Sequence, residues 1–491
     1  MEVKVKKAVI FGLGRSGVGA ANLLASSGAE VVVTDRKSGE ELTGYAHRLS
    51  PSVKLCLGGY PRNMNGADLI VVSPGVPPEI DPIMRARERG IKVIGELELA
   101  YQVLTSNELR VTNEEKDVSR VTRYASPPFL AVTGSNGKST TTTLLDLMLR
   151  KAGFKTLLGG NIGNALTEEI SKIVRSEELS VKSSENSTPD FVVVEVSSFQ
   201  LDTIDEFKPG GATILNITPD HLDRYHSMDE YSDAKAAIFR NQDRSDFLVL
   251  NADDPETMKI RNRKLEVRRI KPRIYFFSRR AEIEGVYFKN GVVRCNIPEI
   301  SLPASHFPLI NVDEIRIKGV HNLENAMASS AMALLAGCPP DAVAAALREF
   351  PGLEHRLEFV RELDGVKYIN DSKGTNVGAV MKSLEGFTSP VLLIAGGRDK
   401  AGDFTALGPL IRGKVKALIL IGEAAEKIGR ALGDLTVTVF ASGMKEAVDT
   451  ARGMADAGDV VLLSPACASF DMFRDFEDRG EQFKKIVRGL S

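Results

Sequence analysis

Residues 129–140 read FLAVTGSNGKST, a short apolar run followed by a glycine-rich turn and the start of a helical pattern. A strand that leads into such a turn and then a helix directs backbone N–H groups and the helix N-terminus at an anion. Lys138 is placed to reach the β- and γ-phosphates of a nucleotide, and the Ser139 hydroxyl is placed to bind Mg²⁺. The stretch therefore predicts a phosphate-binding loop, although Val132 occupies the position where the usual pattern has its first glycine.

Two polar side chains follow later apolar runs of the same segment. Glu195 comes at the end of the run that begins at Phe191, and His221 follows the run 213–217. The carboxyl ends of neighbouring parallel strands meet at one edge of a sheet, so we expect both side chains to lie near Lys138. A carboxylate there suits Mg²⁺, although a glutamate at the end of a strand is common enough to be weak evidence alone.

The same alternation of apolar runs and helical patterns extends in both directions and predicts an α/β fold with parallel sheets. A chain of 491 residues is too long for one core. We expect three domains: a Rossmann-like N-terminal domain over 1–105, a P-loop ATPase-type central domain over 106–352 and a Rossmann-like C-terminal domain over 353–491. The polar stretches 105–128 and 176–189 are predicted to be an insertion or linker and a surface loop.

Composition excludes several classes of protein. The net charge of −2 favours neither nucleic acid nor a membrane surface as a partner. The four cysteines are far apart, which argues against a disulfide framework or a zinc site and fits a reducing compartment. Neither a signal peptide nor an apolar run long enough to span a bilayer is expected. We therefore expect a cytoplasmic protein, without membrane insertion, acting as a monomer.

A second glycine-rich turn, Gly12-Leu13-Gly14-Arg15-Ser16-Gly17, follows the first apolar run. With Asp35 at the end of the next run, it fits the fingerprint of an NAD(P)-binding domain, and taken alone it favours a dehydrogenase. The loop geometry requires only a diphosphate on a helix N-terminus, which a UDP-sugar also supplies. A dehydrogenase and a non-catalytic nucleotide-binding scaffold therefore remain open as alternatives to a phosphoryl-transferring enzyme.

Further motifs follow in order along the chain. They are Gly159-Gly160-Asn161-Ile162-Gly163, Glu195-Val196-Ser197-Ser198-Phe199-Gln200-Leu201, Asp220-His221-Leu222-Asp223-Arg224, His321-Asn322 with Asn325, His355-Arg356, Asn370-Asp371-Ser372-Lys373-Gly374-Thr375-Asn376 and Ser464-Pro465-Ala466-Cys467-Ala468-Ser469-Phe470-Asp471. Together with the loop at 133–140, they resemble the Mur ligase family, which builds the peptide of bacterial cell-wall precursors. The resemblance covers almost the whole chain, and the family's Thr-Gly-x-Asn-Gly-Lys-Ser/Thr loop accounts for Val132.

The resemblance implies an ATP-dependent amide-forming ligase, most like the members that add D-glutamate to UDP-N-acetylmuramoyl-L-alanine in peptidoglycan precursor synthesis. Such an enzyme activates a carboxylate as an acyl phosphate and joins it to an amine. Other family members add L-alanine, diamino acids or dipeptides, and folylpolyglutamate synthases share the chemistry, so these ligases remain alternatives. The residues alone do not identify the base that deprotonates the amine.

The resemblance also implies roles for individual residues. Those expected to act in catalysis are Lys138, His221 and Lys235. Those expected at ATP are Gly134, Asn136, Gly137, Lys138, Ser139, Thr140, Asn325, Arg356 and Asp371. Those expected at two Mg²⁺ ions are Ser139, Glu195, His221 and a carbamylated Lys235. Those expected at the UDP-substrate are Leu13, Arg15, Ser16, Asp35, Arg36, Gly75 and Asn161. Those expected at D-glutamate are Lys373, Thr375, Lys400, Ser469, Phe470 and Phe476.

Overall fold

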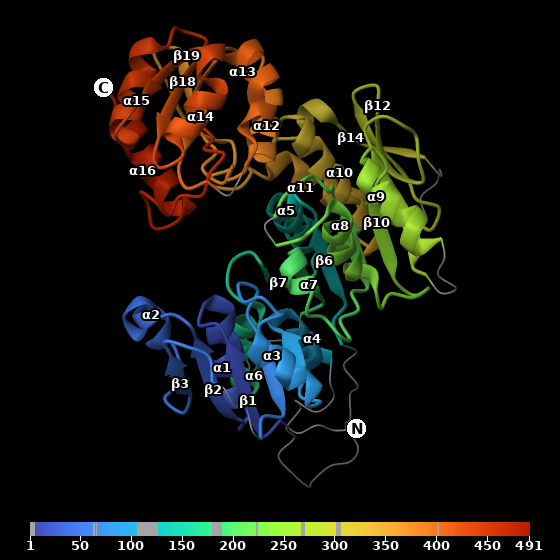
Figure 1. Cartoon of the computed structure of the whole chain (residues 1–491). Helices are drawn as coiled ribbons and strands as arrows, with labels where there is room; N and C mark the ends of the chain where they lie inside the picture. Colours follow the sequence, from blue (N-terminus) through green and yellow to red (C-terminus); the bar gives the residue numbers. More distant parts are fainter. Residues whose placement is uncertain are drawn as a thin grey trace.

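Three α/β units follow one another along the chain, with the central unit lying between the other two (Figure 1). The computed structural model describes residues 5–61, 64, 66–105, 126–178, 189–221, 224–266, 271–300, 306–399 and 402–491. Most of the polar stretches at 105–128 and 176–189 lies outside these residues, and so does Lys400. Each unit has its own mainly parallel sheet, which confirms the α/β class.

The N-terminal unit is a doubly wound parallel sheet. Its strands are β1 (Lys7–Phe11), β2 (Glu30–Asp35), β3 (Lys54–Leu57), β4 (Leu69–Val72) and β5 (Lys92–Gly95), and its helices are α1 (Arg15–Ser26), α2 (Gly39–Ala46), α3 (Asp81–Glu88) and α4 (Glu96–Thr105). The strand order β3-β2-β1-β4-β5 reverses direction between β1 and β4. Ligands of such sheets bind at this switch point, where the Ser73 hydroxyl donates to the Gly12 carbonyl at 3.0 Å.

The central unit has nine strands. They are β6 (Phe129–Thr133), β7 (Thr156–Gly160), β8 (Phe191–Glu195), β9 (Gly211–Ile214), β10 (Phe247–Asn251), β11 (Arg273–Ser278), β12 (Gly285–Lys289), β13 (Val292–Asn296) and β14 (Phe307–Asn311). Their order across the sheet is β14-β13-β12-β11-β10-β9-β6-β8-β7. Neighbouring strands are parallel from the edge strand β7 across the sheet to β12, β6 included. The helices are α5 (Lys138–Lys151), α6 (Leu166–Glu178), α7 (Ser198–Leu201), α8 (Met228–Ala236), α9 (Pro255–Ile260), α10 (Val320–Leu335) and α11 (Pro340–Glu349), with short turns η2 (Ala237–Phe239), η3 (Arg261–Leu265) and η4 (Val312–Glu314).

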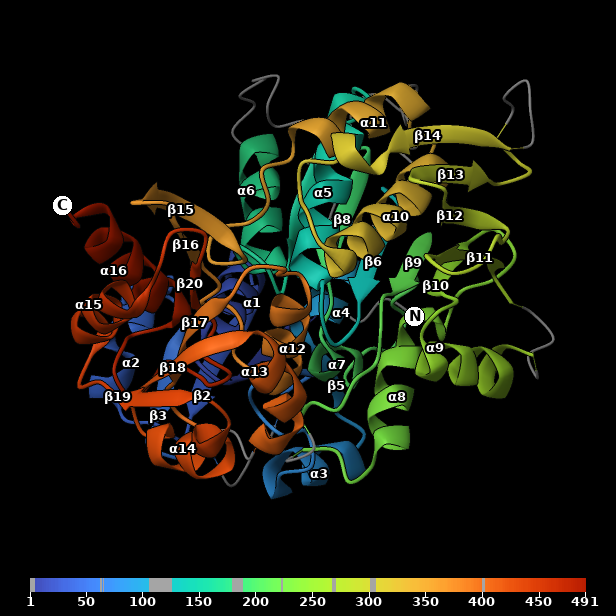
Figure 2. The ribbon, with the colours of Figure 1, turned by 90° about the horizontal axis from the view of Figure 1, so that it is seen from above.

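The two faces of the central sheet belong to different cores. Leu130 and Val132 of β6 pack with α5, α10 and α11, which lie next to one another in Figure 2. Phe129 and Ala131 point the other way, because strand side chains alternate, and they join a core that includes α1 and α4 of the N-terminal unit. The N-terminal and central units therefore share one continuous apolar core.

The C-terminal unit is a six-stranded sheet with helices on both faces. Its strands are β15 (Glu358–Leu363), β16 (Val366–Asn370), β17 (Val391–Gly396), β18 (Val415–Ile421), β19 (Val437–Phe440) and β20 (Val460–Leu463), in the order β15-β16-β20-β17-β18-β19. Its helices are α12 (Val377–Glu385), α13 (Gly408–Lys414), α14 (Ala425–Leu432), α15 (Met444–Met454) and α16 (Phe476–Arg488), with turns η5 (Phe404–Leu407) and η6 (Gly433–Leu435). Separate apolar cores cover the two faces of this sheet.

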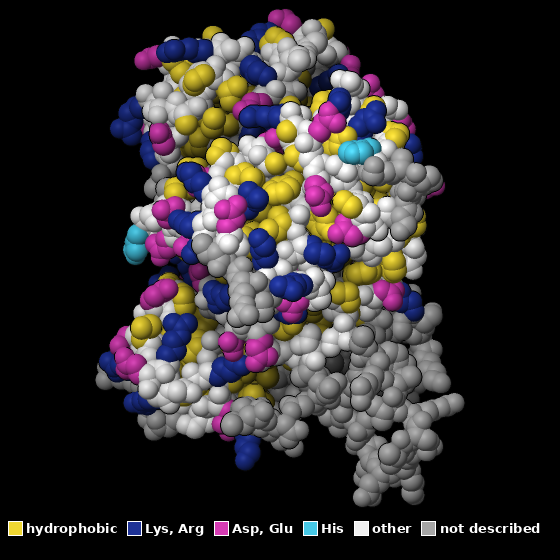
Figure 3. Space-filling view, turned by 90° about the vertical axis from the view of Figure 1, so that its right-hand side faces the viewer, with side chains coloured by type: hydrophobic (Ala, Val, Ile, Leu, Met, Phe, Trp, Pro, Cys, Tyr) yellow, Lys and Arg dark blue, Asp and Glu magenta, His cyan; other side chains and the backbone are white. Residues whose placement is uncertain are grey.

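The predicted strands are present, with one boundary and three omissions to correct. The run 213–217 was expected to be a strand throughout, but β9 ends at Ile214, because Asn216 binds the neighbouring loop instead of a strand partner. The apolar runs do not predict strands β3, β7 and β15, which all lie at sheet edges. The described residues contain no helix long and apolar enough to cross a membrane. On the face in Figure 3, basic and acidic side chains are interspersed.

Candidate active site

The loop after β6 has the geometry that the sequence predicts. Gly137, the residue before α5, has a φ of +85°, and a Cβ atom there would lie 2.2 Å from Oδ1 of Asn325. A residue with a side chain is therefore excluded at this position. The Lys138 ammonium folds back over the loop and donates to the carbonyls of Gly134 and Ser135, both at 2.9 Å. Burial lowers the pKa of Lys138, and the nearby carboxylates of Glu195 and Asp220 act in the opposite direction.

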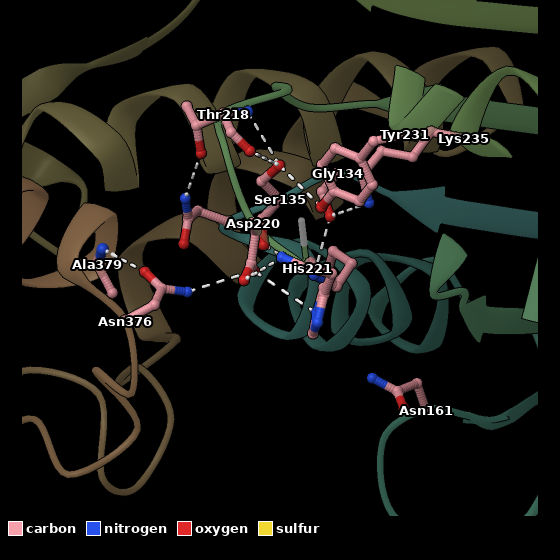
Figure 4. A network of polar contacts seen from close by, with 12 residues as sticks. Gly134, Ser135, Asn161, Thr218, Asp220, His221, Tyr231, Lys235, Asn376 and Ala379 are labelled. Carbon is pink, nitrogen blue, oxygen red and sulfur yellow. Dashed lines mark hydrogen bonds and ion pairs between the residues drawn. The ribbon is translucent and has the colours of Figure 1, made fainter. Parts of the chain in front are cut away.

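Hydrogen bonds from the segment after β9 hold this loop, and Figure 4 shows those between Ser135 and Thr218. The Asn136 N–H donates to Oδ1 of Asn216 at 2.9 Å, and Nδ2 of Asn216 donates to the Asn136 carbonyl at 3.1 Å. The Ser135 hydroxyl donates to the Thr218 carbonyl at 3.0 Å and accepts from the Thr218 N–H at 3.0 Å. The loop is thus held in one conformation from two sides, as electrostatic preorganisation requires.

Glu195, at the end of β8, has a buried carboxylate of which only one oxygen accepts a hydrogen bond from the described residues. Its Oε1 accepts a hydrogen bond from Nδ2 of Asn161 at 2.9 Å. Its Oε2 is buried and has no hydrogen-bond partner among the described residues. A buried anionic oxygen without a donor is costly, so this atom is a ready ligand for a cation.

Lys235 lies within the protein rather than in solvent. It is 2% exposed, although composition alone assigns it to a solvated helix face. Its ammonium donates to the Gly134 carbonyl at 2.9 Å and lies 4.5 Å from the centre of the Tyr231 ring (Figure 4). Burial, with a smaller effect from the nearby Lys138 charge, lowers the pKa of Lys235 well below its usual value. Burial therefore favours the uncharged amine at this position.

His221 sits at the same edge of the sheet. Its backbone is left-handed, with a φ of +54°, a costly conformation for a residue with a side chain. Its Nε2 lies 3.7 Å from Oδ2 of Asp220, and its ring packs edge-on against Phe199 with the centroids 4.7 Å apart. Surrounding contacts therefore hold this imidazole in place.

The C-terminal unit brings a second set of side chains to the same region. Nη2 of Arg356 donates to the Ser139 hydroxyl at 3.1 Å, and Nδ2 of Asn376 lies 3.4 Å from Oδ2 of Asp220. A cleft of about 970 Å³ opens between the two units. Its walls include Asn136, Gly137, Thr140, Asn325, Arg356, Asp371 and Lys373.

Two groups of this cleft have shifted pKa values. Oδ2 of Asp371 accepts from the hydroxyls of Ser383 and Ser464 at 2.7 and 2.6 Å, and burial raises the pKa of Asp371 to about 6. Burial and, secondarily, the Arg356 charge lower the pKa of Lys373 to about 8, and its ammonium lies 3.6 Å from the centre of the Phe476 ring. Perturbed ionisable groups in a cleft mark a functional site.

The other predicted residues of the C-terminal unit lie on loops after β16 and β20. The Thr375 N–H donates to the Lys373 carbonyl at 2.8 Å, Ser469 is 2% exposed and Phe470 is 62% exposed. Sequence reasoning missed Arg479, which is fully buried and whose Nη2 donates to the Ser372 carbonyl at 2.8 Å. In the sequence, Arg479 cannot be told from a solvent-exposed arginine of an amphipathic helix. Only the structure shows that its side chain is buried.

The predicted diphosphate site of the N-terminal unit lies at the carboxyl ends of β1, β2 and β4. The Leu13 N–H donates to Oδ2 of Asp35 at 2.8 Å, so this carboxylate anchors the glycine-rich turn. Nη1 of Arg15 donates to the Gly163 carbonyl of the central unit at 3.2 Å. Three other predicted residues occupy the loops and first helical turn beside it: Ser16, Arg36 and Gly75.

Family models match three consecutive parts of the chain. The Mur ligase MurD-like N-terminal domain matches residues 6–95, the Mur ligase middle domain matches 132–333, and the Mur ligase glutamate ligase domain matches 355–467.

Relatives match over the full length. The UDP-N-acetylmuramoylalanine–D-glutamate ligase of Geotalea daltonii is 44% identical over 100% of this chain and 99% of its own. The protein of the same name from Pelotomaculum thermopropionicum is 42% identical over 99% and 98%.

Solved structures agree in fold. UDP-N-acetylmuramate-alanine ligase MurC from Thermotoga maritima has a TM-score of 0.58 at 17% identity, and each chain is covered to 99%. MurF ligase from Thermotoga maritima, in complex with ADP, has a TM-score of 0.57 at 16% identity and the same coverage. From the full-length identity and the three matched domains, we conclude that this chain belongs to the Mur ligase family.

Proposed function

We propose that this protein is an ATP-dependent ligase that joins D-glutamate to UDP-N-acetylmuramoyl-L-alanine through an acyl-phosphate intermediate. The observation that carries the proposal is the 42–44% identity, over the full chain, to ligases that bear this name. Membership of a ligase family sets aside the dehydrogenase and the non-catalytic scaffold. The glycine-rich turn at residues 12–17 is then a site for a nucleotide diphosphate rather than for NAD(P).

The loop at 134–140 is the proposed site for the triphosphate of ATP. Lys138 offers the cation, and the adjoining cleft has room for a nucleotide between the central and C-terminal units. The residues that we assign to it are Gly134, Asn136, Gly137, Lys138, Ser139, Thr140, Asn325, Arg356 and Asp371. The excluded Cβ at Gly137 and the folded Lys138 side chain support this assignment.

The donor set beside this loop fits magnesium. It combines the Ser139 hydroxyl, the unpartnered Oε2 of Glu195 and the imidazole of His221, and hard oxygen ligands suit Mg²⁺. When bound, Mg²⁺ supplies charge neutralisation and orientation of the transferring phosphoryl group. The fit is carried by Glu195, because its buried oxygen otherwise lacks a partner among the described residues.

We assign Lys235 a carbamate. Its unprotonated amine attacks the carbon of CO₂, an N–C bond forms, and one amine proton passes to water. The product is an anion whose carboxylate oxygens would provide a further ligand for a second Mg²⁺. The lowered pKa of Lys235 supports this reaction, because only the uncharged amine carries a lone pair.

In the first step, a carboxylate oxygen of UDP-N-acetylmuramoyl-L-alanine attacks the γ-phosphorus of ATP, and ADP leaves. Lys138 stabilises the negative charge that spreads over the phosphate oxygens. Arg356 reaches the same place from the C-terminal unit, where it contacts Ser139. In the second step, the amine of D-glutamate attacks the acyl carbon and an N–C bond forms. The C–O bond to phosphate breaks, and the nitrogen gives up one proton, which leaves with the phosphate or passes to water.

The two other substrates have their own proposed sites. D-glutamate carries two carboxylates, which suit cationic and hydroxyl partners, and we assign it Lys373, Thr375, Lys400, Ser469, Phe470 and Phe476. UDP-N-acetylmuramoyl-L-alanine is assigned Leu13, Arg15, Ser16, Asp35, Arg36, Gly75 and Asn161. We further propose a cytoplasmic monomer, with domains over 1–105, 106–352 and 353–491.

ADP release tests the proposal. Purified protein with ATP, Mg²⁺ and UDP-N-acetylmuramoyl-L-alanine should release ADP with D-glutamate, and not with L-glutamate, L-alanine, a diamino acid or D-alanyl-D-alanine. Omitting either the nucleotide-sugar or the amino acid should stop the release, and Lys138→Ala should abolish it. Turnover with a different amino acid, or none with the full set, would refute the assignment.

A further inference from the structure

Arg224 lies where the N-terminal and central units meet, and its guanidinium makes three contacts. Nη1 donates to the Pro74 carbonyl of the N-terminal unit at 3.1 Å. Nη2 lies 3.4 Å from Oδ2 of Asp202. The central carbon lies 4.2 Å from the centre of the Phe199 ring. The side chain is 19% exposed, so these contacts are largely shielded from solvent.

The same side chain supports His221. Phe199, on which the guanidinium rests, packs its ring against the His221 imidazole at 4.7 Å, with the planes 62° apart. The Arg224 and Tyr225 N–H groups both donate to the His221 carbonyl, at 3.0 and 3.1 Å. The left-handed backbone of His221 is unfavourable in itself, and these contacts, together with the Asp220 carboxylate that accepts from the His221 N–H, stabilise it.

The Pro74 carbonyl, which accepts a hydrogen bond from Arg224, lies beside the proposed nucleotide-sugar site. Pro74 follows Ser73, whose hydroxyl donates to the carbonyl of Gly12 in the glycine-rich turn. The bond from Arg224 to Pro74 therefore links that turn with the imidazole beside the phosphate loop. The planar, forked guanidinium can stack on a ring and donate in two directions at once, which a lysine ammonium cannot.

We propose that Arg224 is a positioning residue that sets the register between the nucleotide-sugar loop at Ser73–Pro77 and His221. The inference rests on the proposed function, in which one substrate spans from the N-terminal unit to the phosphate loop. The relative position of the N-terminal and central units therefore decides where the reactive end of such a substrate lies. A misplacement of about 1 Å can cost on the order of 10²-fold in rate.

The test compares Arg224→Gln, Arg224→Lys and Phe199→Leu with the matched control Arg263→Gln. Arg263 is a surface arginine paired with Asp229 and Asp233, and it makes no contact with Phe199, Pro74 or Asp202 among the described residues. Steady-state kinetics give kcat and each KM, and calorimetry without ATP gives the Kd for UDP-N-acetylmuramoyl-L-alanine. Thermal unfolding of each variant reports whether it is folded.

Arg224→Gln should lower kcat about 10- to 100-fold and raise the KM and Kd for the nucleotide-sugar several-fold, while the KM for D-glutamate stays unchanged. Arg224→Lys should recover little, because charge alone does not reproduce the stacked, two-way contact. Phe199→Leu should lower kcat with a smaller effect on Kd, since the Pro74 bond remains. Arg263→Gln should match wild type.

Wild-type kinetics in folded Arg224→Gln would overturn the inference, and so would losses that affect all three substrates equally. Full recovery in Arg224→Lys would also contradict it. If wild-type protein binds the nucleotide-sugar but does not turn it over, the proposed function fails. In that case the Kd of Arg224→Gln for UDP-N-acetylmuramoyl-L-alanine still tests the inference. A Kd equal to that of wild type would reject it.

Discussion

The guanidinium of Arg356, in the C-terminal unit, donates to the hydroxyl of Ser139, in the first turn of α5 of the central unit, at 3.1 Å. The positively charged Arg356 side chain thus contacts the same hydroxyl that we propose as a ligand of Mg²⁺. Burial lowers the pKa of Arg356, whereas the carboxylates of Glu195 and Asp371 raise it, so an anionic phosphate of the nucleotide should likewise favour the charged guanidinium. We infer that nucleotide binding and the position of the C-terminal unit are coupled through this contact.

Ser139→Ala should lower kcat/KM for ATP about 10²- to 10³-fold, the usual loss for one preorganised group. The protein should stay folded, because alanine favours the helix that begins at Lys138. ADP release over a range of ATP and Mg²⁺ concentrations measures the effect. Thr143→Val, one turn along the same helix, is the control, because its hydroxyl has no partner among the described residues. Equal activity in Ser139→Ala and wild type would contradict the magnesium assignment.

Lys235→Ala should abolish activity, and short-chain carboxylates added to the assay should restore part of it. The removed side chain leaves space beside Gly134, where a free carboxylate can take the place of the proposed carbamate. Lys264→Ala is the control, because Lys264 is a surface lysine paired with Asp233. Rescue is measured as ADP release against carboxylate concentration. Full activity in Lys235→Ala would reject the catalytic role, and an inactive variant that no carboxylate restores would count against the carbamate.

Glu195→Gln should lose its response to Mg²⁺ without losing stability. The substitution keeps the shape of the side chain and the bond from Asn161, and it removes a buried negative charge. The melting temperature should be equal to or above that of wild type, while stabilisation by Mg²⁺ and ATP disappears. Glu168→Gln, which affects an ion pair with Arg48, should retain the wild-type response. A normal magnesium response in Glu195→Gln would be inconsistent with the proposed site.

The KM for the amino acid should depend on pH through Lys373. Its pKa of about 8 means that the ammonium form prevails below pH 8 and is lost above it. An anionic substrate binds the charged form, so kcat/KM for D-glutamate should fall as pH rises through 8. Lys373→Arg should flatten this decline, because arginine stays charged, and Lys373→Met should be weak at every pH. If kcat/KM for D-glutamate falls with the same midpoint pH in Lys373→Arg as in wild type, a group other than Lys373 causes the decline.

Local patterns predicted most elements of the fold and part of the site. The strand, turn and helix around residues 129–151 and the end of β8 at Glu195 are properties of a few adjacent residues. The edge strand β15 is not predicted, because it is half-exposed and mixes charged and apolar residues without a clear period.

The three α/β units and the glycine-rich turn before α5 can be predicted from the amino-acid sequence, because a strand period and a need for glycine are encoded over short stretches. The burial of Lys235, the contact between Arg356 and Ser139, which are 217 residues apart, and the bond from Arg224 to Pro74 cannot be predicted in this way. Those contacts depend on how separate units pack, and packing is a property of complementary surfaces rather than of any single segment.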